Sequence, residues 1–572
     1  MADSTKSGLF KSLFGSRKKN TDRQVVALYI PLTLQVGKDI GQNIEAMWNQ
    51  LIQQRLGPLL LLQAANRYLD KINPLPMSYE QRARISNIVL NEVVAAVSSL
   101  FAHFFQQGGG IPETREQRET ISHAVRAVEQ LAINYKLLFR QDWVDPDQGH
   151  ATRDRTLMVA LRIFECARFE QLLLAFRYQK LPDYIWRDVN HLFFALRSDW
   201  DMKAKYPLKV QWTVEDRVSS VELFPKTSNL EQLYLAIELT GLLDVISWPV
   251  HLAYRVVRYL SVIEEPFIKD DESIGDVPAG HCIIYHDQAA PPQFSRTSDQ
   301  GEASLLIDLN PILRQATEDR LTLMSAADTS SVSPPIQEIP ERERIIFLDL
   351  LLHRVQPRQR YEPRQRVFGG QHARLYGGFD TVYRLFDDIN RKDSDKETVK
   401  QERRFWDALA EHINIVAENE EGISEPRWVV ADEGAGGIQL HVQEGEYGLP
   451  VYVGRLVAYN SKEDEFAASR LGYVVRLQRI GDDEVQVAIA RIAGEILPVV
   501  VVVEDGMEQE PLPALMIRAK DGKLQLLCDN KHNFITGDRL AVMFADHRHS
   551  AALGEAIIAQ TDFSLFELHT SA

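Results

Sequence analysis

The chain has 572 residues, of which 45% are hydrophobic and 25% charged, values typical of a globular protein. This length predicts about three domains, because a single hydrophobic core rarely serves so many residues. The formal net charge of −16 argues against a general DNA-binding protein, which would present a broad basic face. A local anion-binding site is compatible with this charge.

The first segment, residues 1–24, is a basic tail in an otherwise acidic chain. Its apolar residues recur at helical spacing, at Leu9, Phe10, Leu13 and Phe14. One interpretation is a flexible, disordered tail. The other is an amphipathic segment that contacts a partner protein or, peripherally, the inner membrane.

The three cysteines, Cys166, Cys282 and Cys528, are far apart in the sequence. This spacing predicts neither a disulfide framework nor a zinc site, and it favours a reducing, cytoplasmic location. No apolar run approaches the roughly 18 to 20 residues that span a bilayer.

Residues 25–262 show helical periodicity and predict an all-helical domain. Its clearest apolar stripe recurs every three or four residues, at Ile85, Ile88, Val89, Val93, Ala96, Val97, Leu100, Phe101 and Phe104. Ser228 and Glu231 fit a capping box before a later helix. No cluster of reactive or metal-binding side chains is expected in this domain. We therefore expect it to present a surface that binds a protein partner.

The pattern changes in the second half of the chain. Residues 263–343 combine short strands with Pro- and Ser-rich linkers. Residues 344–505 contain short β-rich runs separated by Gly and Asp, which predict a small antiparallel barrel with a helical insertion at 377–416. The β pattern returns in residues 506–572, which we expect to form a further small β unit.

An arginine-rich segment precedes the predicted barrel, with Arg358, Gln359, Arg360 and Arg364 close together. Pro363 disfavours a helix here, so the segment is expected to be a loop or extended strand at the barrel entrance. Guanidinium groups bind phosphates in a bidentate manner and stack on aromatic rings. A ligand with both phosphates and purines would use both properties. Alternatively, these arginines are solvated or pair with surface acids.

A glycine-rich turn lies between two apolar β runs, in the segment Asp432-Glu433-Gly434-Ala435-Gly436-Gly437. No Lys-Ser/Thr pair follows these glycines, so the segment is not a P-loop. Glycines at such a place allow a tight turn and a close approach of a flat ligand to the backbone. The carboxylate of Asp432 can accept hydrogen bonds from a purine edge.

These two elements together resemble the PilZ family. Its members carry R-x-x-x-R before a six-stranded antiparallel β-barrel and D/N-x-S-x-x-G on a barrel strand, and they bind cyclic di-GMP between the two. The resemblance covers roughly residues 345–496. It implies an α+β multidomain effector: an all-helical N-terminal domain, a PilZ-like barrel and a further β unit.

The resemblance also implies residue roles. Arg360 and Arg364, with the neighbouring Arg358 and Gln359, would hold the phosphates and stack on the guanines. Asp432 would bind a guanine edge, and Gly434 and Gly437 would shape the turn. The expected protein is a non-enzymatic signalling effector with cyclic di-GMP as its ligand and no metal. It would control motility, type IV pili, twitching, surface attachment or biofilm.

The alternative is a nucleotide-independent adaptor with a degenerate barrel. It is favoured by Gly434, which stands where the family prefers Ser. The intact arginine pair favours nucleotide binding.

Overall fold

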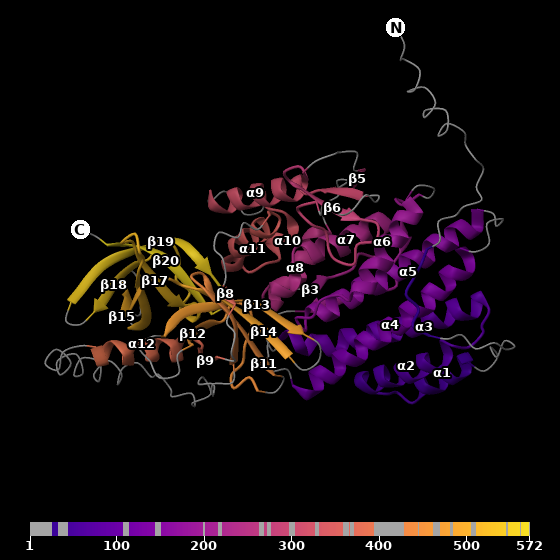
Figure 1. The fold of residues 1–572 in the computed structure, drawn as a ribbon, viewed down its shortest axis with the longest axis horizontal. Helices are drawn as coiled ribbons and strands as arrows, with labels where there is room; N and C mark the ends of the chain where they lie inside the picture. Colours follow the sequence, from indigo (N-terminus) through magenta and orange to yellow (C-terminus); the bar gives the residue numbers. More distant parts are fainter. Residues whose placement is uncertain are drawn as a thin grey trace, which may run out of the picture.

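The computed structural model describes most of the chain, namely residues 26–32, 44–106, 114–143, 150–197, 201–215, 220–261, 268–270, 276–296, 304–325, 331–357, 365–366, 371–393, 428–443, 446–461, 469–480, 484–504, 511–544, 547–560 and 562–570. A helical half is followed by two antiparallel β-barrels (Figure 1). The predicted α+β architecture is confirmed. Arg358, Gln359, Arg360 and Arg364 lie outside the described residues.

The helical half begins with six helices: α1 (Ile44–Gln53), α2 (Pro58–Ile72), α3 (Tyr79–Gln106), α4 (Arg115–Trp143), α5 (His150–Ala175) and α6 (Asp183–Arg197). Helix α4 packs against α2, α3 and α5. The predicted apolar stripe lies on α3, where Val89, Val93 and Val97 are fully buried. Burial of this stripe against neighbouring helices is the main source of helix stability here.

Helix α3 also has the length and composition of a membrane-spanning helix over Tyr79–Phe101, and half of its most apolar window is buried inside the protein. The same helix contacts α2 and α4. These contacts are typical of a helix in the core of a helical domain, where apolar residues pack against neighbouring helices.

Two further helices, α7 (Leu230–Leu242) and α8 (Val250–Leu260), flank the short 3₁₀ helix η1 (Val245–Ser247). The predicted cap of α7 is wrong by one residue. Asn229, in extended conformation, is the N-cap, and its side chain accepts a hydrogen bond of 2.8 Å from the Gln232 amide. The helix begins at Leu230, so Ser228 lies outside the capping position.

The helical half also contains seven short strands among its described residues. Two pairs, β1–β4 and β2–β3, form two-stranded sheets, and β5, β6 and β7 form a three-stranded sheet. Strands β1 and β4 are Tyr206–Pro207 and Thr227–Ser228, and strands β2 and β3 are Thr213–Glu215 and Ser220–Glu222. Strands β5, β6 and β7 are Ile268–Asp270, His281–Tyr285 and Ser304–Asp308.

Three helices precede the barrels: α9 (Asn310–Met324), α10 (Pro334–Gln337) and α11 (Glu341–Arg354). The expected start of the barrel at residue 344 is therefore wrong, because that residue lies in α11. Glu341 and Glu343 occupy the first turn of this helix, and His353 and Arg354 the last. Both placements favour a helix, since they complement its dipole.

The first barrel is a ring of six strands in the order β9–β10–β11–β14–β13–β12, closed by pairing of β12 with β9. The strands are β9 (His372–Gly377), β10 (Trp428–Gly434), β11 (Gly437–Gln443), β12 (Leu456–Asn460), β13 (Arg470–Ile480) and β14 (Glu484–Arg491). Alternate residues of β11, namely Ile438, Leu440 and Val442, are buried in its core. This period of two is the predicted strand pattern.

The second barrel is a closed ring of six strands in the order β15–β16–β17–β20–β19–β18. The strands are β15 (Glu495–Val503), β16 (Leu512–Arg518), β17 (Leu524–Asp529), β18 (Arg539–Phe544), β19 (His547–Ala559) and β20 (Phe563–Thr570). The expected boundary at residue 506 falls inside this barrel. Strand β15 pairs with β16 and β18, so it belongs to the C-terminal unit.

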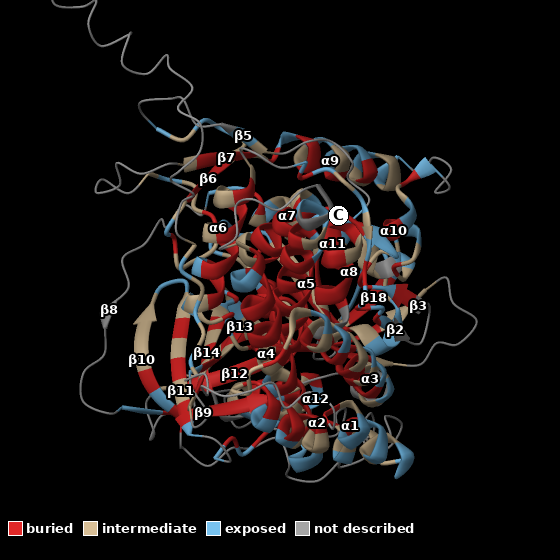
Figure 2. Cartoon of the chain, turned by 90° about the vertical axis from the view of Figure 1, so that its right-hand side faces the viewer, coloured by how far each residue is buried: buried red, intermediate tan, exposed pale blue. Residues whose placement is uncertain are grey.

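Helix α12 (Phe379–Asp393) lies within the insertion predicted at 377–416 and contacts strands of both barrels. Its buried residues Val382 and Phe386 share one hydrophobic cluster with Leu456 of the first barrel and Leu515 of the second. Helix α12 therefore packs against both barrels and joins their cores, and we call it the wedge helix. Figure 2 shows buried residues concentrated where the helices and strands face one another.

Candidate functional site

The predicted glycine turn joins β10 to β11 in the first barrel, with Gly434 opposite Gly437. Gly437 has φ +152°, and a Cβ there would lie 2.0 Å from the Ile489 carbonyl oxygen. Only glycine avoids both the backbone strain and this contact. The turn thus allows β11 to lie close against β14 at this end of the barrel.

The arginine-rich segment leads directly into a two-residue strand, β8 (Gln365–Arg366), which pairs with β10. Arg366 lies opposite Asp432, and Gln365 lies opposite Glu433. Arg364 directly precedes Gln365 in the sequence. The strand that follows the first predicted motif in the sequence therefore pairs with the strand that carries the second.

A row of residues crosses the barrel from Asp432. In the strand registers, Asp432 lies opposite Gln439, Gln439 opposite Ala488, and Ala488 opposite Arg476. Directly opposed residues on neighbouring antiparallel strands share one face of a sheet. The row thus runs over β10, β11, β14 and β13 on the same face, with polar groups at its start and end.

Next to this row lies a second polar group that sequence reasoning did not identify. The His441 Nε2 atom is 2.9 Å from Gln486 Nε2, and its Nδ1 atom contacts Glu484. The alternation of β11 already indicated that Gln439 and His441 share a face, because Ile438, Leu440 and Val442 take the other. The alternation of apolar and polar residues in β11 could therefore have predicted that Gln439 and His441 lie together on the outer face of the strand.

The neighbouring residue on β10, Glu433, is bound by polar groups of other barrel segments. It forms an ion pair with Arg470, and Ser461 donates a hydrogen bond of 3.3 Å to it. A carboxylate held in this way fixes the end of β10 and orients the strand that carries Asp432.

The row ends at a contact with the helical half. Arg476 Nη2 lies 3.7 Å from Asp244 Oδ1, and Arg354 Nη1 lies 3.5 Å from Asp244 Oδ2. Nearby, the Arg479 amide donates a hydrogen bond of 2.9 Å to the Tyr178 carbonyl. Asp244 therefore connects β13, the end of α11 and the N-terminus of η1.

The helical half contains buried ion pairs that sequence reasoning did not identify. Lys136 and Asp188 form a buried ion pair of 2.5 Å, and Arg162 forms another with Glu165. Burial raises the pKa of the Glu165 carboxyl, whereas Arg162 opposes this shift. Such pairs escape sequence reading, because charged residues on amphipathic helices normally face water. The described residues contain no group of three or more potential metal ligands from His, Cys, Asp and Glu.

The helical half also carries the similarity to known proteins. Residues 53–261 match the family model described as the cyclic-di-GMP receptor FimW, N-terminal domain. This FimW-like region extends from the last residue of α1 to the residue after α8 and does not include the barrels. No curated protein and no solved structure matches the chain.

Proposed function

We propose that this protein is a cyclic di-GMP-binding effector of the PilZ type, without catalytic activity of its own. Two independent observations support the proposal. The FimW-like region resembles a domain of a cyclic-di-GMP receptor, and β8, which directly follows Arg364 in the sequence, pairs with the strand that carries Asp432. The second observation carries the site assignment.

In this proposal Arg358, Gln359, Arg360 and Arg364 bind the phosphates and guanines from one side, and Asp432 accepts from a guanine edge. Gln439 adds an amide on the same face of the barrel as Asp432. Arginine can both bind a phosphate in a bidentate manner and stack on a purine ring. A cyclic dinucleotide carries phosphates and purines in one molecule.

The test is calorimetric titration of the full chain with cyclic di-GMP, with GTP and cyclic di-AMP as controls. We expect selective binding with a dissociation constant in the micromolar range or tighter. If no heat is released and cyclic di-GMP leaves the melting temperature unchanged, the proposal is wrong. The nucleotide-independent adaptor would then take its place.

Restoring the serine of the family pattern gives a second test. We expect Gly434→Ser to tighten cyclic di-GMP binding by about 2- to 10-fold, because one added neutral hydrogen bond contributes about 0.5–1.5 kcal/mol. Titration calorimetry measures the change, and Gly57→Ser, at the exposed N-cap of α2 where φ is −62° and an added Cβ meets nothing within 4 Å, is the control. A loss of affinity at Gly434→Ser alone would contradict the proposed role of this turn.

We further propose that ligand binding is transmitted to the helical half through Asp244. Helix α11 ends at Arg354, which pairs with Asp244, and the arginine-rich segment follows shortly afterwards. A ligand that orders this segment would therefore alter the end of α11 and its contact with Asp244 and Arg476. The output would be a changed surface for a protein partner on the helical half.

This coupling predicts an effect of Asp244→Asn. Asn adopts the left-handed conformation that Asp244 has at φ +51°, so the variant removes the charge and keeps the backbone. We expect cyclic di-GMP to slow hydrogen exchange in residues 245–260 of the natural chain by about 5-fold or more. In Asp244→Asn this slowing should be largely lost while affinity changes little, and in the exposed control Asp276→Asn it should persist. Equal slowing in all three chains would contradict the route through Asp244.

The biological output belongs to the same proposal. We infer a cytoplasmic effector that acts on motility, type IV pili, twitching, surface attachment or biofilm. The basic tail of residues 1–24 is the proposed contact with the inner membrane. Liposome co-sedimentation with and without this tail tests that contact, and equal binding of both chains would exclude it.

A further inference from the structure

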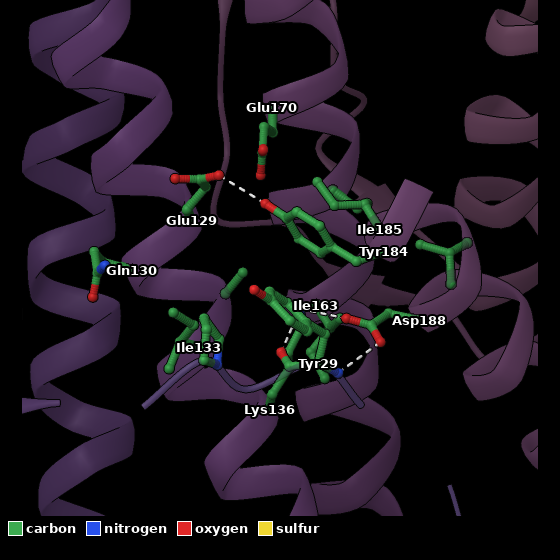
Figure 3. A pocket seen from close by; sticks show the side chains of 14 residues that line it. Tyr29, Glu129, Gln130, Ile133, Lys136, Ile163, Glu170, Tyr184, Ile185 and Asp188 are labelled. Carbon is green, nitrogen blue, oxygen red and sulfur yellow. Dashed lines mark hydrogen bonds and ion pairs between the residues drawn. The ribbon is translucent and has the colours of Figure 1, made fainter. Parts of the chain in front are cut away.

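A cavity of about 210 Å³ lies in the helical half (Figure 3). Its walls come from α4, α5, α6 and the extended segment 26–32. Ile133, Ile163 and Ile185 form its apolar sides. An apolar cavity of about 150 Å³ holds a ligand of the size of benzene, so this one has room for a small organic molecule.

One end of the cavity is closed by groups that satisfy one another. Lys136 pairs with Asp188 at 2.5 Å and lies 3.3 Å from the Tyr29 carbonyl oxygen. The Tyr29 amide donates a hydrogen bond of 2.9 Å to Asp188, and the ring of Tyr29 lies 4.5 Å from that of Tyr184. The charge of Lys136 is therefore neutralised, and the segment around Tyr29 covers the cavity.

The other end is rich in acceptors. Tyr184 donates a hydrogen bond of 2.7 Å to Glu129, and the Glu170 carboxylate points toward the Tyr184 hydroxyl (Figure 3). Glu170 is 1% exposed, and its Oε1 atom has no hydrogen-bond partner among the described residues. A buried polar group without a partner is costly and calls for a specific reason.

We propose that this cavity is a ligand site for a primary ammonium or guanidinium group on a short aliphatic stem. The cation would pair with Glu170 and Glu129, and its stem would lie against Ile133 and Ile163. An anion would be repelled by the Glu129 carboxylate, and an apolar ligand would leave Glu170 unpartnered. This site is independent of the nucleotide site proposed above.

The charged groups around Glu170 affect its pKa and therefore the proton release expected on amine binding. Burial raises the pKa of Glu170 well above its usual range, Glu129 adds to this shift and Lys136 opposes it. The other titratable groups that line the cavity are Tyr29, Tyr184 and Asp188. An entering ammonium group would favour the carboxylate form of Glu170, and the proton that this form gives up would pass to solvent as the carboxylate–ammonium pair forms.

The ligand chemistry has two sources, a free alkylamine and a Lys or Arg side chain of a partner. We would titrate the full chain with pentylamine, agmatine and Nα-acetyl-lysine methylamide, with pentan-1-ol as the neutral control. Binding of the amines but not of the alcohol is expected. Tighter binding of pentylamine or agmatine indicates a free amine, and tighter binding of the acetyl-lysine derivative indicates a protein side chain.

Two variants test the site itself. Glu170→Gln and Glu129→Gln should each weaken amine binding at least about tenfold, as expected for loss of a charged hydrogen-bond partner, and Glu116→Gln, at an exposed position of α4, should not. Titrations in phosphate and in Tris should give different heats in the natural chain, because a proton is released, and equal heats in Glu170→Gln. The proposal fails if no amine binds at millimolar concentration, or if folded Glu170→Gln and Glu129→Gln both bind as well as the natural chain.

Discussion

Replacing both Arg360 and Arg364 with alanine is expected to lower the affinity for cyclic di-GMP by about 100-fold or more. Hydrogen bonds to charged groups contribute about 1.5–3 kcal/mol each, and the proposed site places two such groups on the ligand. The fold should be unaffected, because the described strands of the first barrel close without these residues. Titration calorimetry measures the loss, and thermal melting checks the fold.

The matched control is Arg384→Ala, which removes an arginine from the exposed side of α12. It should leave the affinity unchanged. If the double variant binds as tightly as the natural chain, the arginine-rich segment is not the phosphate site, and the pairing of β8 beside Asp432 has another purpose. If both variants lose affinity, the effect reflects net charge and long-range attraction of the anion.

The second large effect is expected at the wedge helix. Phe386→Ala should lower the free energy of unfolding by about 3–5 kcal/mol, because it removes a buried ring and leaves a cavity. Phe386 is buried in the cluster that contains Leu456 and Leu515, one from each barrel. Urea unfolding measures the change, and hydrogen exchange should show loss of protection in both β12 and β16.

Arg384→Ala, on the exposed side of the same helix, is the control for helix propensity and should change stability little. Loss of protection in β12 alone would mean that α12 supports only the first barrel. A change in stability below about 1 kcal/mol would contradict its role as a wedge, since a buried Phe rarely contributes so little.

The sequence predicts the type of most elements, because each has a clear period. The stripe of α3 repeats every three to four residues, and the buried residues of β11 alternate. It does not predict which strands pair. The run of valines in β15 identifies a strand, but only its register with β16 and β18 assigns it to the second barrel.

The candidate site shows a similar division between what the sequence predicts and what only the fold provides. Asp432, Gly434 and Gly437 were recognised by type and spacing, and the pairing of Arg366 with Asp432 required the fold. The acceptors of the helical cavity could not be found in this way. Glu129, Glu170 and Tyr184 lie on three helices, and their local sequence resembles any water-facing side of a helix.

The closure of the second barrel limits how other proteins can bind to it. A strand at the edge of an open sheet offers unpaired backbone groups, to which a partner can add a strand of its own. Each of the six strands β15–β20 has two neighbours in the ring. Recognition of this barrel therefore depends on side chains and their shape, which makes it selective among partners and resistant to sheet-to-sheet aggregation.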